Sequence, residues 1–204
     1  MENQEIEVKF YVSDLPAIQA HLVQLGAQLV QPRTLEQNLR YDTPGGDLRR
    51  SLKVLRLRQD TAARMTFKGP AWSHDGARLR EEIEMQVESF EQARRLLAAL
   101  GYQVEMIYEK YRTKYELDEV HLDLDEMPYG NFIELEGQDV PAIRALSDRL
   151  GLDWDASSPL SYVMLFDTLK SKRKLPFRDL SFENFAQIKL SAEDLGLMAA
   201  DKGS

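Results

Sequence analysis

The chain lacks cysteine altogether, which excludes disulfides, thiolate metal sites and cysteine nucleophiles. It also lacks any apolar run near the ~20 residues of a membrane-spanning helix. Its start, MENQEIEVKF, has neither the basic nor the apolar stretch of a signal peptide. Basic residues are not in excess either, since the chain has 26 Lys and Arg but 34 Asp and Glu. These absences predict a cytoplasmic protein that binds neither nucleic acid nor membranes.

Two glutamates one residue apart occur in three predicted strands. The pairs are Glu5-Ile6-Glu7, Glu82-Ile83-Glu84 and Glu134-Leu135-Glu136. Residues two apart on a strand point to the same face, so each pair presents adjacent carboxylates. Such carboxylates raise each other's pKa unless a cation lies between them. The repetition indicates a site for a metal ion and a highly charged anion.

Periodicity and turn residues predict a chain of strands interrupted by helices. Ser13 and Ser89 are the expected N-caps of the first two helices. Leu-Gly ends each of the first three helices. The predicted strands are 4–12, 38–42, 52–59, 63–69, 78–87, 104–117, 119–126 and 131–136; the predicted helices are 14–25, 90–100, 140–150 and 158–170; residues 71–77 are a predicted loop.

One face of nearly every predicted strand carries charged residues and almost no neutral polar ones. The basic strands present Arg56 and Arg58, then Lys110 and Arg112, opposite apolar neighbours. A sheet with one solvated face explains any single strand. The consistent sorting of acids and bases favours strands that curl, so that the charged faces line an interior and the helices cover the apolar outside.

Carboxylates without cysteine favour Mg²⁺ or Mn²⁺ over zinc. Arginine forks suit phosphate oxygens. A linear triphosphate carries enough negative charge for both the cation and the basic residues. These residue types therefore predict a metal-assisted site for a triphosphate group.

The ordered motifs resemble the CYTH family, also called triphosphate tunnel metalloenzymes. The Glu5-x-Glu7-x-Lys9 sequence is similar to the ExExK motif of that family. Further similar blocks follow in order, and the resemblance covers roughly residues 4–170. These blocks are Tyr41-Asp42-Thr43-Pro44, Leu55-Arg56-Leu57-Arg58, Thr66-Phe67-Lys68-Gly69, Arg80-x-Glu82-x-Glu84, Lys110-x-Arg112, Leu124-Asp125-Glu126 and Gly130-Asn131-Phe132-Ile133-Glu134-Leu135-Glu136.

The resemblance implies an α+β fold: an antiparallel eight-stranded β-barrel that forms a tunnel with a charged interior, with helices outside. Residues 1–170 would form this domain, and 171–204 a helical or partly ordered C-terminal extension. Motif by motif, the implied metal ligands are Glu5, Glu7, Asp125, Glu134 and Glu136, with Asp123 as a substitute for Asp125. The implied phosphate-binding residues are Lys9, Arg56, Arg58, Lys68, Arg80, Lys110 and Arg112. The implied catalytic residues are Glu5, Glu7, Lys9, Glu82 and Glu84.

Three functions fit these residues. The first is a metal-dependent hydrolase of inorganic triphosphate, thiamine triphosphate or a nucleoside triphosphate. The second is a class IV-like adenylate cyclase that makes cyclic AMP and pyrophosphate from ATP. The third is a non-catalytic module that binds polyphosphate or nucleotide, although such a module would not need so many carboxylates. The expected partner is a small triphosphate substrate, and a homodimer is compatible with the sequence.

Overall fold

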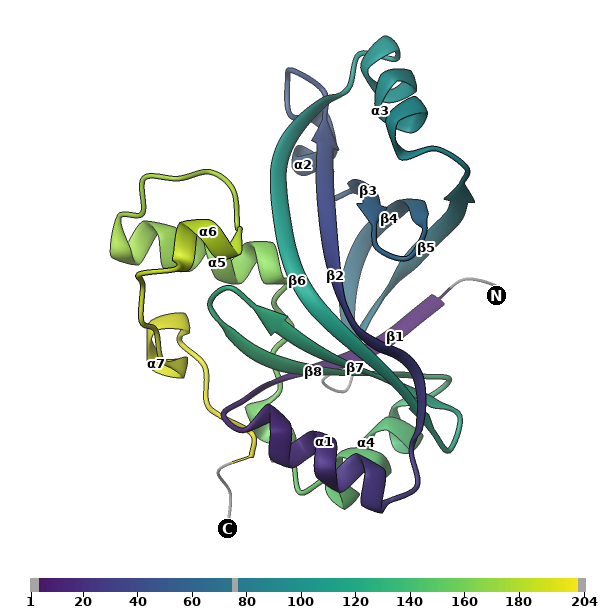
Figure 1. Ribbon diagram of the computed structural model, residues 1–204, viewed down its shortest axis with the longest axis vertical. Helices are drawn as coiled ribbons and strands as arrows, with labels where there is room; N and C mark the ends of the chain where they lie inside the picture. Colours follow the sequence, from purple (N-terminus) through teal and green to yellow (C-terminus); the bar gives the residue numbers. More distant parts are fainter. Residues whose placement is uncertain (1–3, 75–76, 202–204) are drawn as a thin grey trace.

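The structure, a computed structural model, describes residues 4–74 and 77–201. Eight antiparallel strands carry helices on their outside, which confirms the predicted α+β class (Figure 1). The strands are β1 (Gln4–Val12), β2 (Gln28–Asp42), β3 (Val54–Gln59), β4 (Ala63–His74), β5 (Ala77–Val87), β6 (Gln103–Leu117), β7 (Val120–Met127) and β8 (Gly130–Gly137). The helices are α1 (Leu15–Gln24), α2 (Asp47–Arg50), α3 (Phe90–Ala99), α4 (Val140–Arg149), α5 (Tyr162–Arg173), α6 (Phe182–Phe185) and α7 (Ala192–Leu195), with a 3₁₀ turn at Trp154–Ala156.

The strands pair in the order β1-β5-β4-β3-β2-β6-β7-β8. This order returns to its first strand, as in a closed barrel, because β1 pairs with β5 on one side and β8 on the other. The β1–β5 ladder is short, from Gln4 to Glu7, whereas the β1–β8 ladder runs from Ile6 to Val12. Side chains alternate along each strand, so the charged residues of the predicted strands share the inner face.

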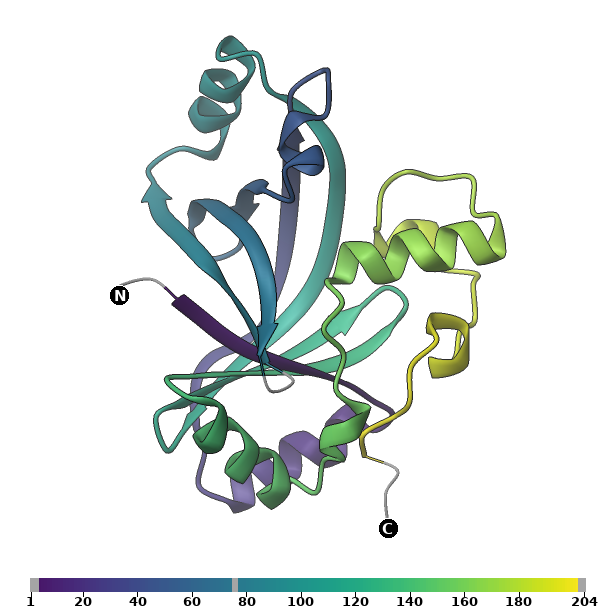
Figure 2. The same ribbon diagram turned by 180° about the vertical axis from the view of Figure 1, so that it is seen from behind.

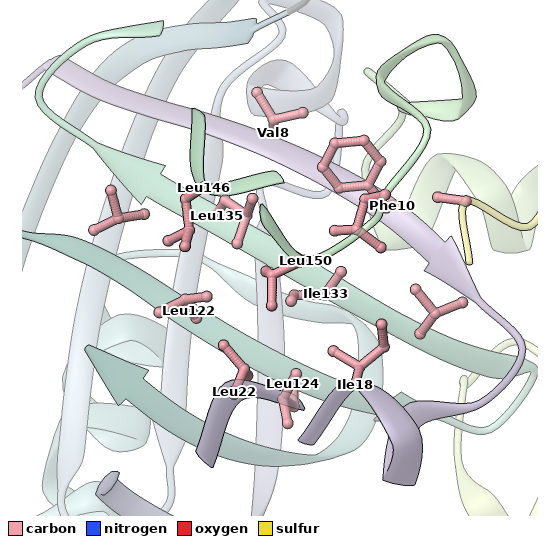
Figure 3. Packing of buried hydrophobic residues seen from close by; sticks show 14 of the residues in the cluster. Val8, Phe10, Ile18, Leu22, Leu122, Leu124, Ile133, Leu135, Leu146 and Leu150 are labelled. Atoms are coloured by element: carbon pink, nitrogen blue, oxygen red, sulfur yellow. The ribbon is translucent and has the colours of Figure 1, made fainter. Parts of the chain in front are cut away.

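Helices α1 and α4 lie together against the outer face of β1, β7 and β8 (Figures 1 and 2). Figure 3 shows Leu22 of α1 and Leu146 of α4 packed over Leu122 and Leu135 of the strands. These four side chains are almost fully buried. Burial of a leucine or isoleucine side chain contributes roughly 1.5–3 kcal/mol, so this layer holds the inner-face residues of three strands in place.

Local signals in the sequence define the ends of the helices. The Ser89 hydroxyl accepts a hydrogen bond from the backbone N–H of Gln92 and caps α3, as predicted. The predicted cap of α1 was wrong by one residue, because Asp14, not Ser13, accepts from the Ala17 N–H. After α1 the chain turns at Gly26, whose φ of 86° is a left-handed conformation that only glycine adopts without strain.

Two strands, β2 and β4, are longer than predicted by five residues or more. The chain forms β2 from residue 28 onward although Pro32 lies within it, because irregular pairing with β6 between residues 29 and 34 accommodates the proline. The predicted loop 71–77 was wrong for residues 71–74, which extend β4. Gly69 and Pro70 form a bulge there instead of ending the strand. Residues 75 and 76 lie outside the described part of the chain.

The C-terminal segment after α5 packs back onto the barrel. Leu180 exchanges backbone hydrogen bonds with β6, accepting from the Glu109 N–H and donating to the Ile107 carbonyl, both at 2.9 Å. The Ala200 N–H donates to the Tyr11 carbonyl at 2.9 Å. The Asp201 carboxylate accepts from backbone N–H groups just before α1. Within the described residues, no helix is long and apolar enough to cross a membrane.

Candidate functional site

A cavity of about 1010 Å³ opens inside the barrel. Inner-face residues of the strands line it, together with Pro159 to Met164 at the start of α5. Among its described lining residues, thirteen are Lys or Arg and eight are Asp or Glu. The whole chain has the opposite balance, with a net charge of −8. Cations are therefore concentrated around this cavity, where they can surround a bound anion.

Carboxylates gather on one side of the cavity, on β1, β7 and β8. The cross-strand registers place Glu7 beside Glu136, and Glu134 beside Asp123. All four residues line the cavity, and we call them the acidic wall. Lys9 lies within it and forms an ion pair with Glu134 at 2.9 Å. Glu5 pairs through its backbone with Arg80, but its side chain lies outside the described part of the structure.

Arg112 of β6 ties the acidic wall together. Its guanidinium contacts the carboxylates of Asp123, Asp125 and Glu134. Burial raises the pKa of Glu134, but the charges of Lys9 and Arg112 outweigh burial and hold that pKa well below its usual range. In contrast, burial raises the pKa of Asp123 more than the nearby cations lower it. The two neighbouring acids therefore differ in how readily they take up a proton.

Asp125 and Asp123 have different environments although both were candidate ligands. Asp125 is fully buried and does not line the cavity. Its carboxylate accepts hydrogen bonds from Lys110 at 3.0 Å, from Arg112 and from the Tyr162 hydroxyl at 2.7 Å. Asp123 lines the cavity. Of the two, Asp123 is thus the one that a ligand in the cavity would meet, and Asp125 anchors the cations around it.

Cations dominate the other side of the cavity. Lys110 of β6 joins the basic residues of β3 and β4 there, and we call Arg56, Arg58, Lys68 and Lys110 the basic wall. The paired glutamates of β5 hold two of them: Lys68 lies 2.6 Å from Glu82, and Arg58 donates to Glu84 at 3.2 Å. Arg80 of β5 also lines the cavity. Glu82 and Glu84 are therefore each paired with a basic neighbour in this wall.

A known domain family matches the part of the chain that forms the barrel. The CYTH domain model matches residues 3–146, which include every strand of the barrel. The chain belongs to the CYTH domain family. A protein of Methanocaldococcus jannaschii that is provisionally named an adenylate cyclase is 27% identical over 134 residues, which span 65% of this chain and 75% of that protein.

Solved structures share the CYTH fold with this chain. One is a Vibrio parahaemolyticus protein, provisionally named an adenylate cyclase, with a TM-score of 0.73 and 21% identity over 82% of this chain and 99% of that one. Another is a Hippeastrum protein, with a TM-score of 0.60 and 20% identity over 80% of this chain and 95% of that one. That protein is described as a provisional adenylyl cyclase with a dominant triphosphatase activity.

Two residues inside this CYTH barrel escaped the sequence prediction. Glu36 and Asn38 are fully buried on the inner side of β2. Alternation with Leu35 and Leu39 was the available signal, but Pro32 hid the first half of the strand. Tyr162 of α5 also reaches the site, and the centroid of its ring lies 4.2 Å from the Lys9 ammonium. Its place in the cavity depends on a tertiary contact of α5, which no local pattern encodes.

The acidic wall of the CYTH barrel has the donor chemistry of a magnesium or manganese site. All its donors are carboxylate oxygens, on neighbouring positions of three strands. Among the described residues, no three of these groups converge into a ready-made metal cluster. Mg²⁺ does not need one, because it commonly uses one or two carboxylates and completes its shell with water and substrate phosphates. The residues present therefore fit such an ion.

Proposed function

We propose that the protein is a divalent-metal-dependent phosphohydrolase. Its substrate would carry a triphosphate group and bind in a tunnel between the acidic and basic walls. The observation that carries this proposal is the excess of cations around the cavity of an acidic protein, facing a row of carboxylates. A site for a simple anion would not need the carboxylates, and a site for a metal ion alone would not need the cations.

The basic wall would bind the phosphate chain. Arg58 offers a planar guanidinium and Lys110 a compact ammonium charge. Both are already held by hydrogen bonds to carboxylates, Arg58 by Glu84 and Lys110 by Asp125. Such preorganised donors stabilise the charge that develops on phosphate oxygens during cleavage, at little reorganisation cost. Lys9, between the acidic wall and Tyr162, would bind the phosphate nearest to that wall.

Mg²⁺ or Mn²⁺ would be held by Glu7, Glu134 and Glu136, with Glu5 joining them by its motif and Asp123 by its position. A divalent cation bound there would neutralise phosphate oxygens and make an attacking water a stronger nucleophile. The ionised state of Glu134 supports this assignment, because a low pKa keeps the carboxylate free of protons at neutral pH.

The decisive experiment is product analysis. Purified protein with Mg²⁺ or Mn²⁺ would receive inorganic triphosphate, thiamine triphosphate and ATP in parallel reactions. We expect orthophosphate release, and the best substrate would name the enzyme. Stoichiometric pyrophosphate and cyclic AMP from ATP would overturn the hydrolase proposal.

The second candidate is an adenylate cyclase. Its support is the cavity itself, which is large for an inorganic triphosphate and has several apolar residues in its lining. These include Val54, Met106, Val163 and Met164. An adenosine group could pack there while its phosphates lie along the basic wall. The provisional names of the relatives point the same way.

A non-catalytic phosphate binder is the outcome to exclude. Glu5→Gln removes one carboxylate charge from the ExExK motif with little change in shape. It should abolish turnover in either enzyme. In a pure binder, the same change would spare or improve the affinity for inorganic triphosphate.

A further inference from the structure

A buried acid that the proposed mechanism does not use lies behind the basic wall. Glu36 of β2 is fully buried and pairs with Lys110 across the β2–β6 ladder. Its carboxylate lies 3.7 Å from the Lys110 ammonium and 3.7 Å from the Arg58 guanidinium. Neither oxygen has a hydrogen-bond partner among the described residues. These are ion-pair distances without the short contacts of a charge-assisted hydrogen bond.

The Glu36 carboxylate carries a full charge despite its burial. Burial raises its pKa, but the charges of Lys110 and Arg112, with those of Arg58 and Arg56, lower the pKa to about 2. Coulomb interactions decay slowly in a protein interior, where the effective dielectric constant is well below that of water. This negative charge therefore acts on anything that the neighbouring cations bind.

Other carboxylates already fix the geometry of these cations. Lys110 donates to Asp125 at 3.0 Å, and Arg58 donates to Glu84 at 3.2 Å. Glu36 makes no such bond, so orientation of the two side chains does not depend on it. What Glu36 adds at this place is charge, next to the two cations but not among the residues that line the cavity.

We propose that Glu36 acts through Lys110 and Arg58 and limits how tightly the basic wall holds phosphate. Its charge lies behind Lys110 and Arg58 and opposes every anion that these cations bind in the cavity. The inference rests on the proposed function, since it needs a phosphate chain on the basic wall. It implies that the protein gives up affinity for substrate and product so that cleaved phosphate leaves.

A purely structural Glu36 predicts a different result. If the acid only offset the repulsion between Lys110 and Arg58, its neutralisation would loosen the cations and leave phosphate binding equal or weaker. If it opposes bound anions, the same change strengthens binding. The sign of the change in affinity therefore separates the two roles.

The test compares Glu36→Gln with Glu126→Gln. The control makes the same chemical change at an acid that pairs with exposed Arg33 outside the cavity. Binding of tripolyphosphate and of pyrophosphate would be measured by calorimetry in EDTA, where no turnover occurs. We expect Glu36→Gln to lower both dissociation constants at least tenfold, and Glu126→Gln to leave them within twofold. In the metal-loaded enzyme, kcat and KM of Glu36→Gln should fall together.

Two further variants keep the test decisive. Glu36→Asp retains the charge and should restore affinity to within about threefold of the wild type. Asn38→Asp adds a buried charge at the next inward position of β2, beside Arg58, and should weaken anion binding at least tenfold. Asn38→Asp decides the question if Glu36→Gln does not fold.

The outcomes separate the inference from the proposed function. Equal or weaker binding by folded Glu36→Gln, or unchanged binding by Asn38→Asp, would overturn the role of Glu36. Failure of the wild type to turn over any triphosphate would overturn the hydrolase proposal instead. The affinity comparison would still be valid in that case, because it is made without turnover.

Discussion

The acidic and basic walls differ in their charges on the inner face of the barrel and also in the hydrophobic packing on its outer face. The strands of the acidic wall are backed by α1 and α4 through a large core that includes Leu122, Ile133 and Leu135. Around the basic wall the cover is thinner: α3 contributes Ala93 and Leu97 to a smaller core over β2 and β3. The carboxylates proposed to bind a metal ion thus lie on the more extensively packed strands, and the cations proposed to bind the phosphate chain lie on the other side.

The buried charges show the same contrast. Asp125, behind the acidic wall, is saturated with hydrogen bonds from three side chains. Glu36, behind the basic wall, has none among the described residues. A saturated buried acid stabilises one arrangement of its partners, whereas an unbonded one mainly sets the local potential. The two acids therefore differ in what their removal would do.

The largest expected effect comes from Asp125→Ala. It leaves Lys110 and Arg112 buried with one carboxylate fewer, which should cost about 3–5 kcal/mol of the free energy of unfolding. Urea denaturation would measure the loss. Asp123→Ala removes the same charge at the cavity surface and should cost less than half as much. Equal losses of stability for the two variants would contradict the conclusion that Asp125 anchors the buried cations while Asp123 lines the cavity.

Truncation of outer-face side chains tests the difference in hydrophobic packing between the two walls. Leu135→Ala, behind the acidic wall, should cost about 2–5 kcal/mol because its side chain is fully buried. Ile83→Ala, on the outer side of β5, should cost less than about 1 kcal/mol because that side chain is 50% exposed. Thermal or urea unfolding of both variants checks this. If the two costs are alike, the outer face of β5 is covered in solution.

Loss of a carboxylate from the acidic wall should slow turnover strongly with little effect on folding. Glu136→Gln should lower turnover about 100-fold, equivalent to about 2.7 kcal/mol. Steady-state phosphate release from the best triphosphate would measure it. Glu126→Gln, on the same sheet but outside the cavity, serves as the control. An active Glu136→Gln enzyme would remove this residue from the proposed metal ligands.

Acid pH should lower the free energy of unfolding through protonation of Glu36. Its pKa of about 2 in the folded protein lies below the 4.5 expected in the unfolded chain. The stabilisation from this carboxylate is complete above the unfolded value and is lost as pH falls toward the folded one. Linkage gives a loss of about 2 kcal/mol between pH 5 and pH 3. Unfolding of the wild type and Glu36→Gln at both pH values would isolate it, and identical slopes would count against a buried ionised Glu36.

The sequence predicted most of the strands and the charged inner face, because alternation along a strand records which side each residue occupies. Glu7, Lys9 and Glu134 were placed correctly in one cavity by this rule. Alternation along a strand does not show how deeply a side chain on the inner face is buried. For that reason Asp123 and Asp125 looked equivalent in the sequence. In the structure, Asp123 lines the cavity, whereas Asp125 is buried and accepts hydrogen bonds from Lys110 and Tyr162.

Residues that depend on long-range contacts were beyond local reasoning. Tyr162 enters the site because α5 packs against the barrel through Phe166 and Leu169, and nothing near Tyr162 in the sequence encodes that docking. Glu36 was missed for another reason. A proline such as Pro32 is unfavourable inside a paired strand, so the sequence did not predict a strand there. The irregular pairing between β2 and β6 accommodates it.

The pairing of β1 has a consequence for how the chain folds. β1 is made first, yet Val12 pairs with Asn131 of β8, far along the chain. Contacts between such distant residues are slow to form, because the loop between them must close first. Until then β1 has two unpaired edges, and a charged strand is a poor template for aggregation. We expect Glu7 and Lys9 to protect the newly made strand before they line a cavity.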